Sequence, residues 1–286
     1  MKKCYFIIND DKFKIETNSL NIYNFLKKEL YHDTNSNIYK MNIKIIYKNK
    51  VDVFKKNILL DYNVSCDNII LRNNKDNYLL TLDNDSYYSY RRYVMNKIAE
   101  YYKNKLDLII LHATAIEKNG EAFLIVGEKH AGKSTISLGM VLNKGYNLIS
   151  DDTCIIYKKD NSIYVEGIFS GINANEKTIS LLRGIKSQYI DDEEILTKER
   201  YYVKNVCKKG LVKGIIFCTR GAENSFNLEM NSYKKIKNNL LYNFDLKKSY
   251  FIQSIEIDYL IYKYNFVRTD DLTGNIEYLN NKIKEI

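Results

Sequence analysis

A glycine-rich loop between an apolar run and a helical pattern constrains this chain more than any other feature. Residues 127–134 read GEKHAGKS, which fits the Walker A pattern G-x-x-x-x-G-K-[ST]. The apolar residues 123–126 precede the loop, and a helical pattern starts near Lys133. Glycines allow several backbone N–H groups to approach one phosphate group, and the positive end of the helix adds to the attraction. The sequence therefore predicts an α/β unit with a phosphate-binding loop.

This loop supplies the candidate residues for binding a nucleotide. Lys133 provides a mobile positive charge for the phosphates, and the hydroxyl group of Ser134 can bind Mg²⁺. The predicted nucleotide-binding positions are Gly127, Glu128, Lys129, His130, Ala131, Gly132, Lys133, Ser134 and Thr135. The alternative is an ordinary glycine-containing turn between a strand and a helix, which requires no ligand.

A two-residue turn predicts the strand geometry before the loop. Asn119-Gly120 lies between the strand-like runs 108–111 and 123–126. An Asn-Gly pair favours a type I′ turn, because this turn needs a positive φ at both central residues. We therefore expect an antiparallel hairpin rather than a β-α-β crossover. Counting outward from the turn, the register places His112 opposite Gly127, at the mouth of the loop. His112 is thus a candidate catalytic residue; the alternative is a structural histidine at a strand end.

Two consecutive carboxylates follow the next strand-like segment. Residues 146–150 are followed directly by Asp151 and Asp152, and they come shortly after the predicted helix of the loop. The helix runs away from the phosphates and the strand runs back, so we expect both aspartates beside the loop. One can hold Mg²⁺ together with Ser134, and the other can take a proton from an acceptor hydroxyl. The alternative is a pair of aspartates in an ordinary turn.

The remaining segments predict two parts. Residues 1–85 read as a small α+β domain without a chemical motif, which makes it a candidate for substrate selection. A helical pattern at 86–105 opens the second domain, 86–286. The acidic residues 191–194 are interpreted as a solvated loop or helix start rather than a metal site. Predicted strands lie at 4–8, 41–47, 57–60, 68–72, 78–82, 154–157, 163–165 and 211–218, and predicted helices at 20–30, 175–182, 233–241 and 271–286.

Composition argues against several classes of protein. The five cysteines contain no C-x-x-C pair, which disfavours a disulfide framework and a cysteine zinc site. The longest apolar stretch, 106–116, is well short of the roughly 18 residues of a membrane span. The short apolar run after the basic N-terminus does not fit a signal peptide. We therefore expect a cytoplasmic protein without a membrane partner.

The net charge of +9 and the 26 tyrosines suggest nucleic-acid binding at first sight. However, the lysines are spread along the chain without a block of five or six, and no pattern of a nucleic-acid-binding fold is present. A bias in overall composition explains the charge more simply, so the sequence does not favour a nucleic-acid partner.

The combination of these motifs resembles the HPr kinase/phosphorylase superfamily. In particular it is similar to the HPr-kinase-like serine kinases of bacterial peptide-biosynthesis clusters. About 50 residues carry the resemblance, and the remainder of 90–286 agrees only in the order of elements. The similar segments are Leu111 to Ala115, Asn119-Gly120, Phe123 to Thr135 and Leu148 to Asp152.

The resemblance implies a phosphoenolpyruvate-carboxykinase-like nucleotide domain with a mixed sheet, ATP and Mg²⁺ as cofactors, and phosphoryl transfer to a hydroxyl group such as that of serine. Lys133 would then contact the β- and γ-phosphates, with Ser134 and Asp151 at the metal. Asp152 would be the base that activates the acceptor, and His112 would assist that carboxylate. The order of the two aspartate roles is less constrained than the pair itself.

One region departs from the family pattern. The glycine-rich signature of the bacterial HPr kinases contains an arginine, which is missing from residues 166–173 here. The resemblance therefore does not extend to HPr as the substrate, to reverse phosphorolysis or to a hexamer. The oligomeric state stays open, as do the roles of Glu166, Glu176, Arg183 and Arg220.

Two further classes of function compete with an ATP-dependent kinase acting on a peptide, protein or metabolite. The first is a nucleotide-binding regulatory ATPase or partner module that transfers no phosphoryl group to a substrate. The second, a basic nucleic-acid binder, predicts an affinity that falls steeply with salt. The simultaneous presence of Lys133, Ser134, Asp151 and Asp152 favours the kinase.

Overall fold

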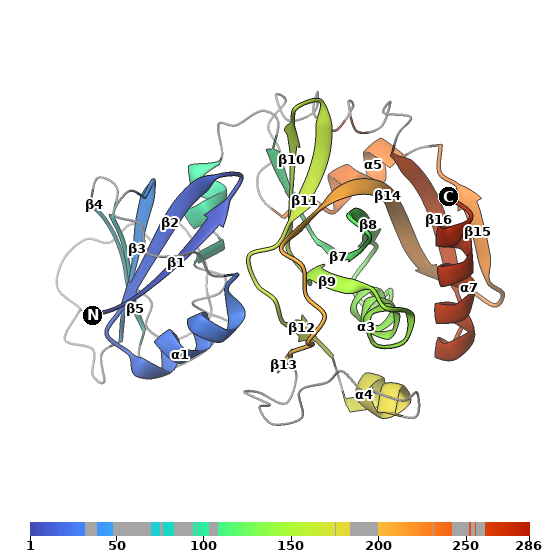
Figure 1. Cartoon of the computed structure of the whole chain (residues 1–286), viewed down its shortest axis with the longest axis horizontal. Helices are drawn as coiled ribbons and strands as arrows, with labels where there is room; N and C mark the ends of the chain where they lie inside the picture. The colour runs from blue at the N-terminus through green and yellow to red at the C-terminus, as the bar shows by residue number, and fades with distance from the viewer. Residues whose placement is uncertain are drawn as a thin grey trace. The chain divides into compact units, whose positions relative to one another are not determined.

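The chain forms two compact units, Met1–Asn104 and Lys105–Ile286, in the computed structural model (Figure 1). Each unit has its own sheet. The structure describes residues 1–31, 39–47, 70–74, 77–82, 94–95, 97–102, 108–174, 176–183, 200–230, 232–241, 252, 255 and 261–286.

The first unit is built on a five-stranded sheet with the order β1-β2-β3-β5-β4. Its strands are β1 (Lys2–Ile8), β2 (Asp11–Thr17), β3 (Met41–Tyr47), β4 (Ile70–Asn74) and β5 (Asn77–Leu82). Helix α1 (Leu20–Glu29) lies between β2 and β3, which pair in parallel. The hydroxyl of Ser19 caps this helix by accepting from the N–H of Ile22 at 3.2 Å. The first unit thus combines helix and sheet and contains β2, which was not predicted, while the predicted strand 57–60 lies outside the described residues.

The boundary between the units lies at residues 104 and 105 rather than at 85 and 86. Residues 94–95 and 97–101 are helical, as predicted, and they belong to the first unit. Tyr102 explains this, because its buried hydroxyl group donates to the main-chain oxygen of Ile8 at 2.9 Å. Phe13 of β2 also packs edge-on against the rings of Tyr101 and Tyr102.

Among the described residues, the second unit contains a mixed sheet of nine strands, which confirms the predicted α/β class. The order along it is β6-β10-β11-β14-β8-β7-β9, and β16 pairs with both β14 and β15. The strands are β6 (Leu108–Leu111), β7 (Ala113–Lys118), β8 (Glu121–Val126), β9 (Asn147–Ser150), β10 (Cys154–Lys159), β11 (Ser162–Glu166), β14 (Lys209–Arg220), β15 (Ser225–Leu228) and β16 (Tyr262–Arg268). A separate short pair joins β12 (Ile172–Asn173) to β13 (Arg200–Tyr201), and the helices are α3 (Lys133–Lys144), α4 (Glu176–Arg183), α5 (Ser232–Asn238) and α7 (Leu272–Lys284).

Strand direction brings four strand ends to one edge of this sheet. β14 is parallel to both β8 and β16. β7 is antiparallel to β8 and to β9, so β9 runs in the same direction as β8. The C-terminal ends of β8, β9, β14 and β16 therefore lie along the same edge, and the segments that follow them can meet there.

The predicted hairpin is confirmed, with one difference in its outer strand. β7 and β8 pair in the expected register, from Lys118 opposite Glu121 to Ala113 opposite Val126. Asn119 and Gly120 have φ values of 56° and 88°, as a type I′ turn requires. However, β6 does not continue the hairpin; it pairs with β10 instead. The chain changes partner at residue 112, whose N–H donates to the main-chain oxygen of residue 239 at 2.7 Å.

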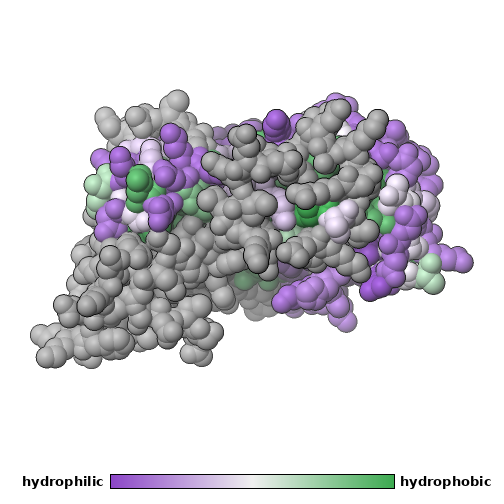
Figure 2. Space-filling view, turned by 90° about the horizontal axis from the view of Figure 1, so that it is seen from below, coloured by the Kyte–Doolittle hydropathy of each residue, from purple (hydrophilic) through white to green (hydrophobic). Residues whose placement is uncertain are grey.

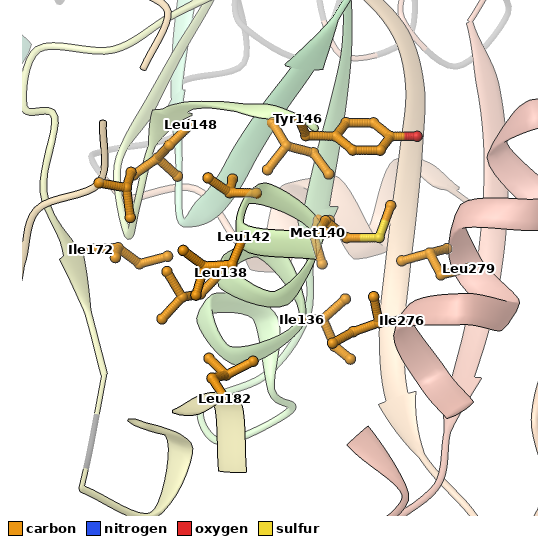
Figure 3. Packing of buried hydrophobic residues seen from close by; sticks show 14 of the residues in the cluster. Ile136, Leu138, Met140, Leu142, Tyr146, Leu148, Ile172, Leu182, Ile276 and Leu279 are labelled. Carbon is orange, nitrogen blue, oxygen red and sulfur yellow. The ribbon is translucent and has the colours of Figure 1, made fainter. Parts of the chain in front are cut away.

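Helices α3 and α7 pack side by side over one face of the sheet. Ile136 and Met140 of α3 face Ile276 and Leu279 of α7 (Figure 3). Gly139 allows this close approach, because a Cβ at this position would lie 2.8 Å from Cγ1 of Ile276. Hydrophilic side chains predominate at the right-hand edge of Figure 2, where α7 and β15 lie. Within the described parts of the chain, no helix combines the length and apolar character needed to cross a membrane.

The α3–α7 contact generates a prediction about stability. Ile276 is 2% exposed, so Ile276→Ala should lower the free energy of unfolding by about 2–5 kcal/mol through lost burial and a residual cavity. The matched control is Leu228→Ala, because Leu228 is 64% exposed and its removal should change stability by less than about 0.5 kcal/mol. Urea unfolding followed by circular dichroism measures both. Equal losses in the two variants would contradict the packing described here.

Candidate active site

The glycine-rich loop leaves β8 and lies against the end of β14. A Cβ at Gly127 would come within 2.5 Å of the main-chain oxygen of Cys218, so only glycine permits this approach. His130 and Gly132 have φ values of 70° and 92°, in the left-handed region. Gly132 is the N-cap residue of α3, and as a glycine it has no side chain with which to cap the helix. The N-terminal N–H groups of α3 therefore have no side-chain acceptor from the cap residue.

Lys133 is folded back into the loop. Its side chain is buried, and Nζ donates to the main-chain oxygens of Gly127 and Glu128 at 3.0 and 3.1 Å. Burial lowers the pKa of Lys133, although the nearby carboxylates of Asp152 and Asp151 oppose this shift. The amine is thus held by neutral carbonyl groups at the position from which it can reach an anion in the loop.

Asp151 connects the loop to the rest of the site. Its carboxylate is fully buried and accepts hydrogen bonds from several of the described groups. The hydroxyl groups of Ser134 and Thr114 donate to Oδ1 at 2.7 and 2.8 Å, and the N–H of Asn173 donates to Oδ2 at 2.7 Å. Hydrogen bonds to an ionised group are stronger than neutral ones, and they offset the cost of burying this charge. The structure therefore brings together the loop serine and the first aspartate, as predicted.

Asp152 is held in a less common conformation. Its φ of 63° lies in the left-handed region, which costs energy for a residue other than glycine. The side-chain amide of Asn173 donates to Oδ2 of Asp152 at 2.6 Å. Asn173 thus contacts both aspartates, one through its main chain and the other through its side chain.

His112 lies beside Asp152, but it contacts the main chain. Its Nδ1 is 3.1 Å from the main-chain oxygen of Asp152. A carbonyl oxygen can only accept, so this contact places a proton on Nδ1. The resemblance implied assistance to the carboxylate itself. The observed contact instead supports the left-handed backbone of Asp152.

Arg268, which the sequence analysis missed, lies against the loop at the end of β16. Its Nε donates to the main-chain oxygen of Ala131 at 2.6 Å, and Nη1 donates to that of Thr269 at 3.2 Å. The thiol of Cys218 donates to the same oxygen of Ala131 at 3.3 Å. A Cβ at Gly132 would lie 2.8 Å from Cζ of Arg268, so the guanidinium group needs a glycine there.

Thr114 and Asn173 were also missed as site residues. Both lie in segments that the sequence analysis had singled out, since Thr114 follows His112 by two residues and Asn173 ends the region 166–173. Arg268 follows an alternation of aromatic and polar residues at 262–266 that is typical of a strand and was not used, but nothing in the sequence places the end of this strand at the loop.

Other candidate residues lie outside this cluster. Glu128, Lys129 and His130 are exposed on the loop. The hydroxyl of Thr135 is 3.0 Å from that of Thr178 on α4. Glu166 is buried and forms an ion pair with Lys208 at 3.1 Å, whereas Arg220 forms an exposed ion pair with Asp270. The side chains of Glu176 and Arg183 and the whole of residues 191–194 lie outside the described part of the chain.

The oxygen atoms of Ser134 and Asp151 suit a hard cation such as Mg²⁺. The part of the chain that the structure describes contains no group of three His, Cys, Asp or Glu residues that could enclose a metal. Mg²⁺ is commonly held by one or two carboxylates together with water and substrate phosphates, so a closed protein site is not required. The donor set therefore fits Mg²⁺ bound together with a phosphate ligand.

Comparison with known proteins provides little beyond this geometry. No protein-family model matches the chain, and no curated protein matches its sequence. Among solved structures, it is similar to the Hpr(Ser) kinase/phosphatase from Coxiella burnetii with a TM-score of 0.33 and 14% identity. The match covers 62% of this chain and 97% of that chain.

The contact between Gly132 and Arg268 can be tested with two glycine variants. Gly132 and Gly120 have similar φ values, 92° and 88°, so Gly→Ala should cost each about 1–2 kcal/mol in backbone strain. A Cβ at Gly120 meets nothing within 4 Å, whereas one at Gly132 displaces the guanidinium of Arg268. We expect Gly132→Ala to be more destabilising by about 1 kcal/mol, the value of a lost hydrogen bond. Urea unfolding measures this, and the excess should disappear when Arg268→Ala is also present.

Proposed function

We propose that the second unit is an ATP- and Mg²⁺-dependent kinase that transfers the γ-phosphoryl group to a hydroxyl group of a peptide, protein or small metabolite. One observation carries the proposal. Two adjacent carboxylates lie at the phosphate-binding loop with different side-chain partners, because Asp151 accepts from the hydroxyl group of Ser134 in the loop and Asp152 accepts from the side-chain amide of Asn173.

The loop and its lysine would bind the phosphate chain. The amine of Lys133 can exchange the carbonyl oxygens of Gly127 and Glu128 for phosphate oxygens, which are stronger, charged acceptors. Ser134 and Asp151 would hold Mg²⁺, which neutralises charge on the phosphates when it is bound. Loss of Lys133 should therefore weaken the binding of nucleotide itself.

Asp152 is suited to act as the general base. Asn173 donates to Oδ2, and no group among the described residues donates to Oδ1. The acceptor hydroxyl would pass its proton to Oδ1 while its oxygen forms a bond to the γ-phosphorus. The bond from that phosphorus to the bridging oxygen breaks, and ADP leaves. The left-handed backbone of Asp152, supported by His112, keeps the carboxylate in this orientation.

The two steps can be separated by two substitutions. Asp152→Asn should leave the affinity for Mg·ATP within about threefold but lower transfer by at least about 100-fold, because a general base acts on the acceptor. Lys133→Ala should weaken Mg·ATP binding by at least about tenfold. Calorimetry measures binding, and γ-labelled ATP with fractionated host extract measures transfer. Full transfer by Asp152→Asn would show that another group is the base.

The same assay distinguishes the alternative functions. Label on a peptide, protein or metabolite with the wild type alone would support the kinase and identify the class of its substrate. Label that appears only as inorganic phosphate would support a regulatory ATPase instead. Unaltered nucleic-acid binding by Lys133→Ala, with strong salt dependence and no nucleotide binding, would support the basic nucleic-acid binder.

Asn173 is expected to act through Asp152. Asn173→Ala removes the donor to Oδ2 and should lower transfer about tenfold while the affinity for Mg·ATP is retained. In the Asp152→Asn background the same substitution should have no further effect on transfer, since the group that it orients is already lost. The matched control is Asn143→Ala, whose side-chain amide bonds within α3 to the main-chain oxygen of Gly139. Additive losses in the double variant would contradict this role.

A further inference from the structure

Arg268 reaches the phosphate-binding loop from a distant part of the chain. It is the last residue of β16, which runs parallel to β14, and β14 runs parallel to β8. The strand directions therefore bring Arg268 to the edge at which β8 enters the loop. The side chain uses this position, because its Nε donates to the main-chain oxygen of Ala131 at 2.6 Å.

The guanidinium group of Arg268 lies beside the N-terminus of α3. It packs against Gly132, the N-cap residue of α3, which makes no side-chain capping bond. The N-terminus of a helix carries a partial positive charge, so a cation beside it is repelled and an anion is attracted. A side chain at position 132 would collide with the guanidinium group of Arg268. Gly132 is therefore needed both for its positive φ and for the space that Arg268 occupies.

Lys133 resembles Arg268 in its hydrogen-bond partners. Within the described part of the chain, neither Lys133 nor Arg268 forms an ion pair, and both donate to main-chain carbonyl oxygens. No described residue accepts from Nη2 of Arg268. A guanidinium group can bind two phosphate oxygens at once through neighbouring N–H groups, so two carbonyl-bound cations at one loop suit a polyphosphate chain.

We propose that Arg268 is a second cationic ligand of the phosphate chain and acts there together with Lys133. Nε stays on Ala131, and the Nη groups bind phosphate oxygens. This role rests on the proposed function, in which the loop binds Mg·ATP. Because the contact involves the phosphates alone, it applies equally to inorganic tripolyphosphate, a probe without a nucleoside.

Arg220 provides a matched control. It is the register partner of Arg268 on the neighbouring strand β14 and belongs to the same residue type. Its side chain is 65% exposed and forms an ion pair with Asp270, and among the described residues it forms no hydrogen bond or ion pair with the loop. Arg220→Gln therefore removes the same charge from the same sheet edge without changing the phosphate-binding loop.

The test is calorimetric binding of Mg·ATP and of tripolyphosphate to the full chain and its variants. Arg268→Gln should weaken the binding of both by at least about tenfold and by a similar factor. Arg220→Gln should change either affinity by less than about twofold. The dependence of tripolyphosphate affinity on salt should also become shallower in Arg268→Gln, because one direct charge contact is lost. A role confined to supporting the loop would leave this dependence unchanged.

Failure of the proposed function looks different from failure of the Arg268 role. A wild-type chain that binds no Mg·ATP, or a Lys133→Ala variant that binds it normally, would overturn the proposed function. Normal binding by Arg268→Gln, an equal loss in Arg220→Gln or an unchanged salt dependence would overturn the role of Arg268 alone. If Arg268→Gln does not fold, Arg268→Lys decides, since it keeps the charge but loses the two-pronged donor. Binding weakened about three- to tenfold then supports the proposal, and wild-type binding overturns it.

Discussion

The buried carboxylate of Asp151 is the interaction on which the site depends. It follows β9 and accepts hydrogen bonds from Thr114 on β7, Ser134 on α3 and Asn173 on β12. Four elements of the second unit are thus joined at one fully buried charge. A buried carboxylate that loses its donors is costly, and so are buried donors that lose their carboxylate. The position of the loop relative to the second aspartate is therefore determined by the same contacts that stabilise the fold.

Residues other than glycine with a positive φ occur mainly in turns. Among the described residues, non-glycine positions with positive φ occur at the hairpin turns Asn9–Asp10, Asn119 and Asp160–Asn161 and at two other places, His130 and Asp152. The turn residues are of the types that tolerate this conformation, and the turns require it. His130 is the third residue of a turn that the N–H of Ala131 closes on the main-chain oxygen of Glu128 at 3.1 Å, and a type II turn needs a positive φ at this position. Asp152 differs, because it lies between β9 and β10, which do not pair with each other, beside the glycine-rich loop. Strain of this kind persists where the surrounding contacts over-determine it, which is typical of functional sites.

Local chemistry explains why part of the site was predictable. The Asn119-Gly120 turn determines the register of the β7–β8 hairpin, and the loop motif requires a strand before it and a helix after it. The position of β16 beside the loop could not be predicted from such local patterns. Residues 262–266 of this strand do alternate between aromatic and polar side chains, which is a strand signal that was not used, but this pattern does not indicate the partner strand. The pairing of β16 with β14 is parallel, and such pairing joins segments that are distant in sequence.

Sequence patterns alone were enough to predict the glycine-rich loop between a strand and a helix, the hairpin that precedes it and the aspartate pair at the end of the returning strand. Each of these depends on turn chemistry or strand direction within about 40 residues. Three contacts instead depend on how distant segments pack together: Asn173 with both aspartates, His112 with the main chain of Asp152, and Arg268 with the loop. Arg268 and Ala131 are 137 residues apart, and no local periodicity encodes such a contact. It arises because parallel strands bring their C-terminal ends to a common edge of the sheet.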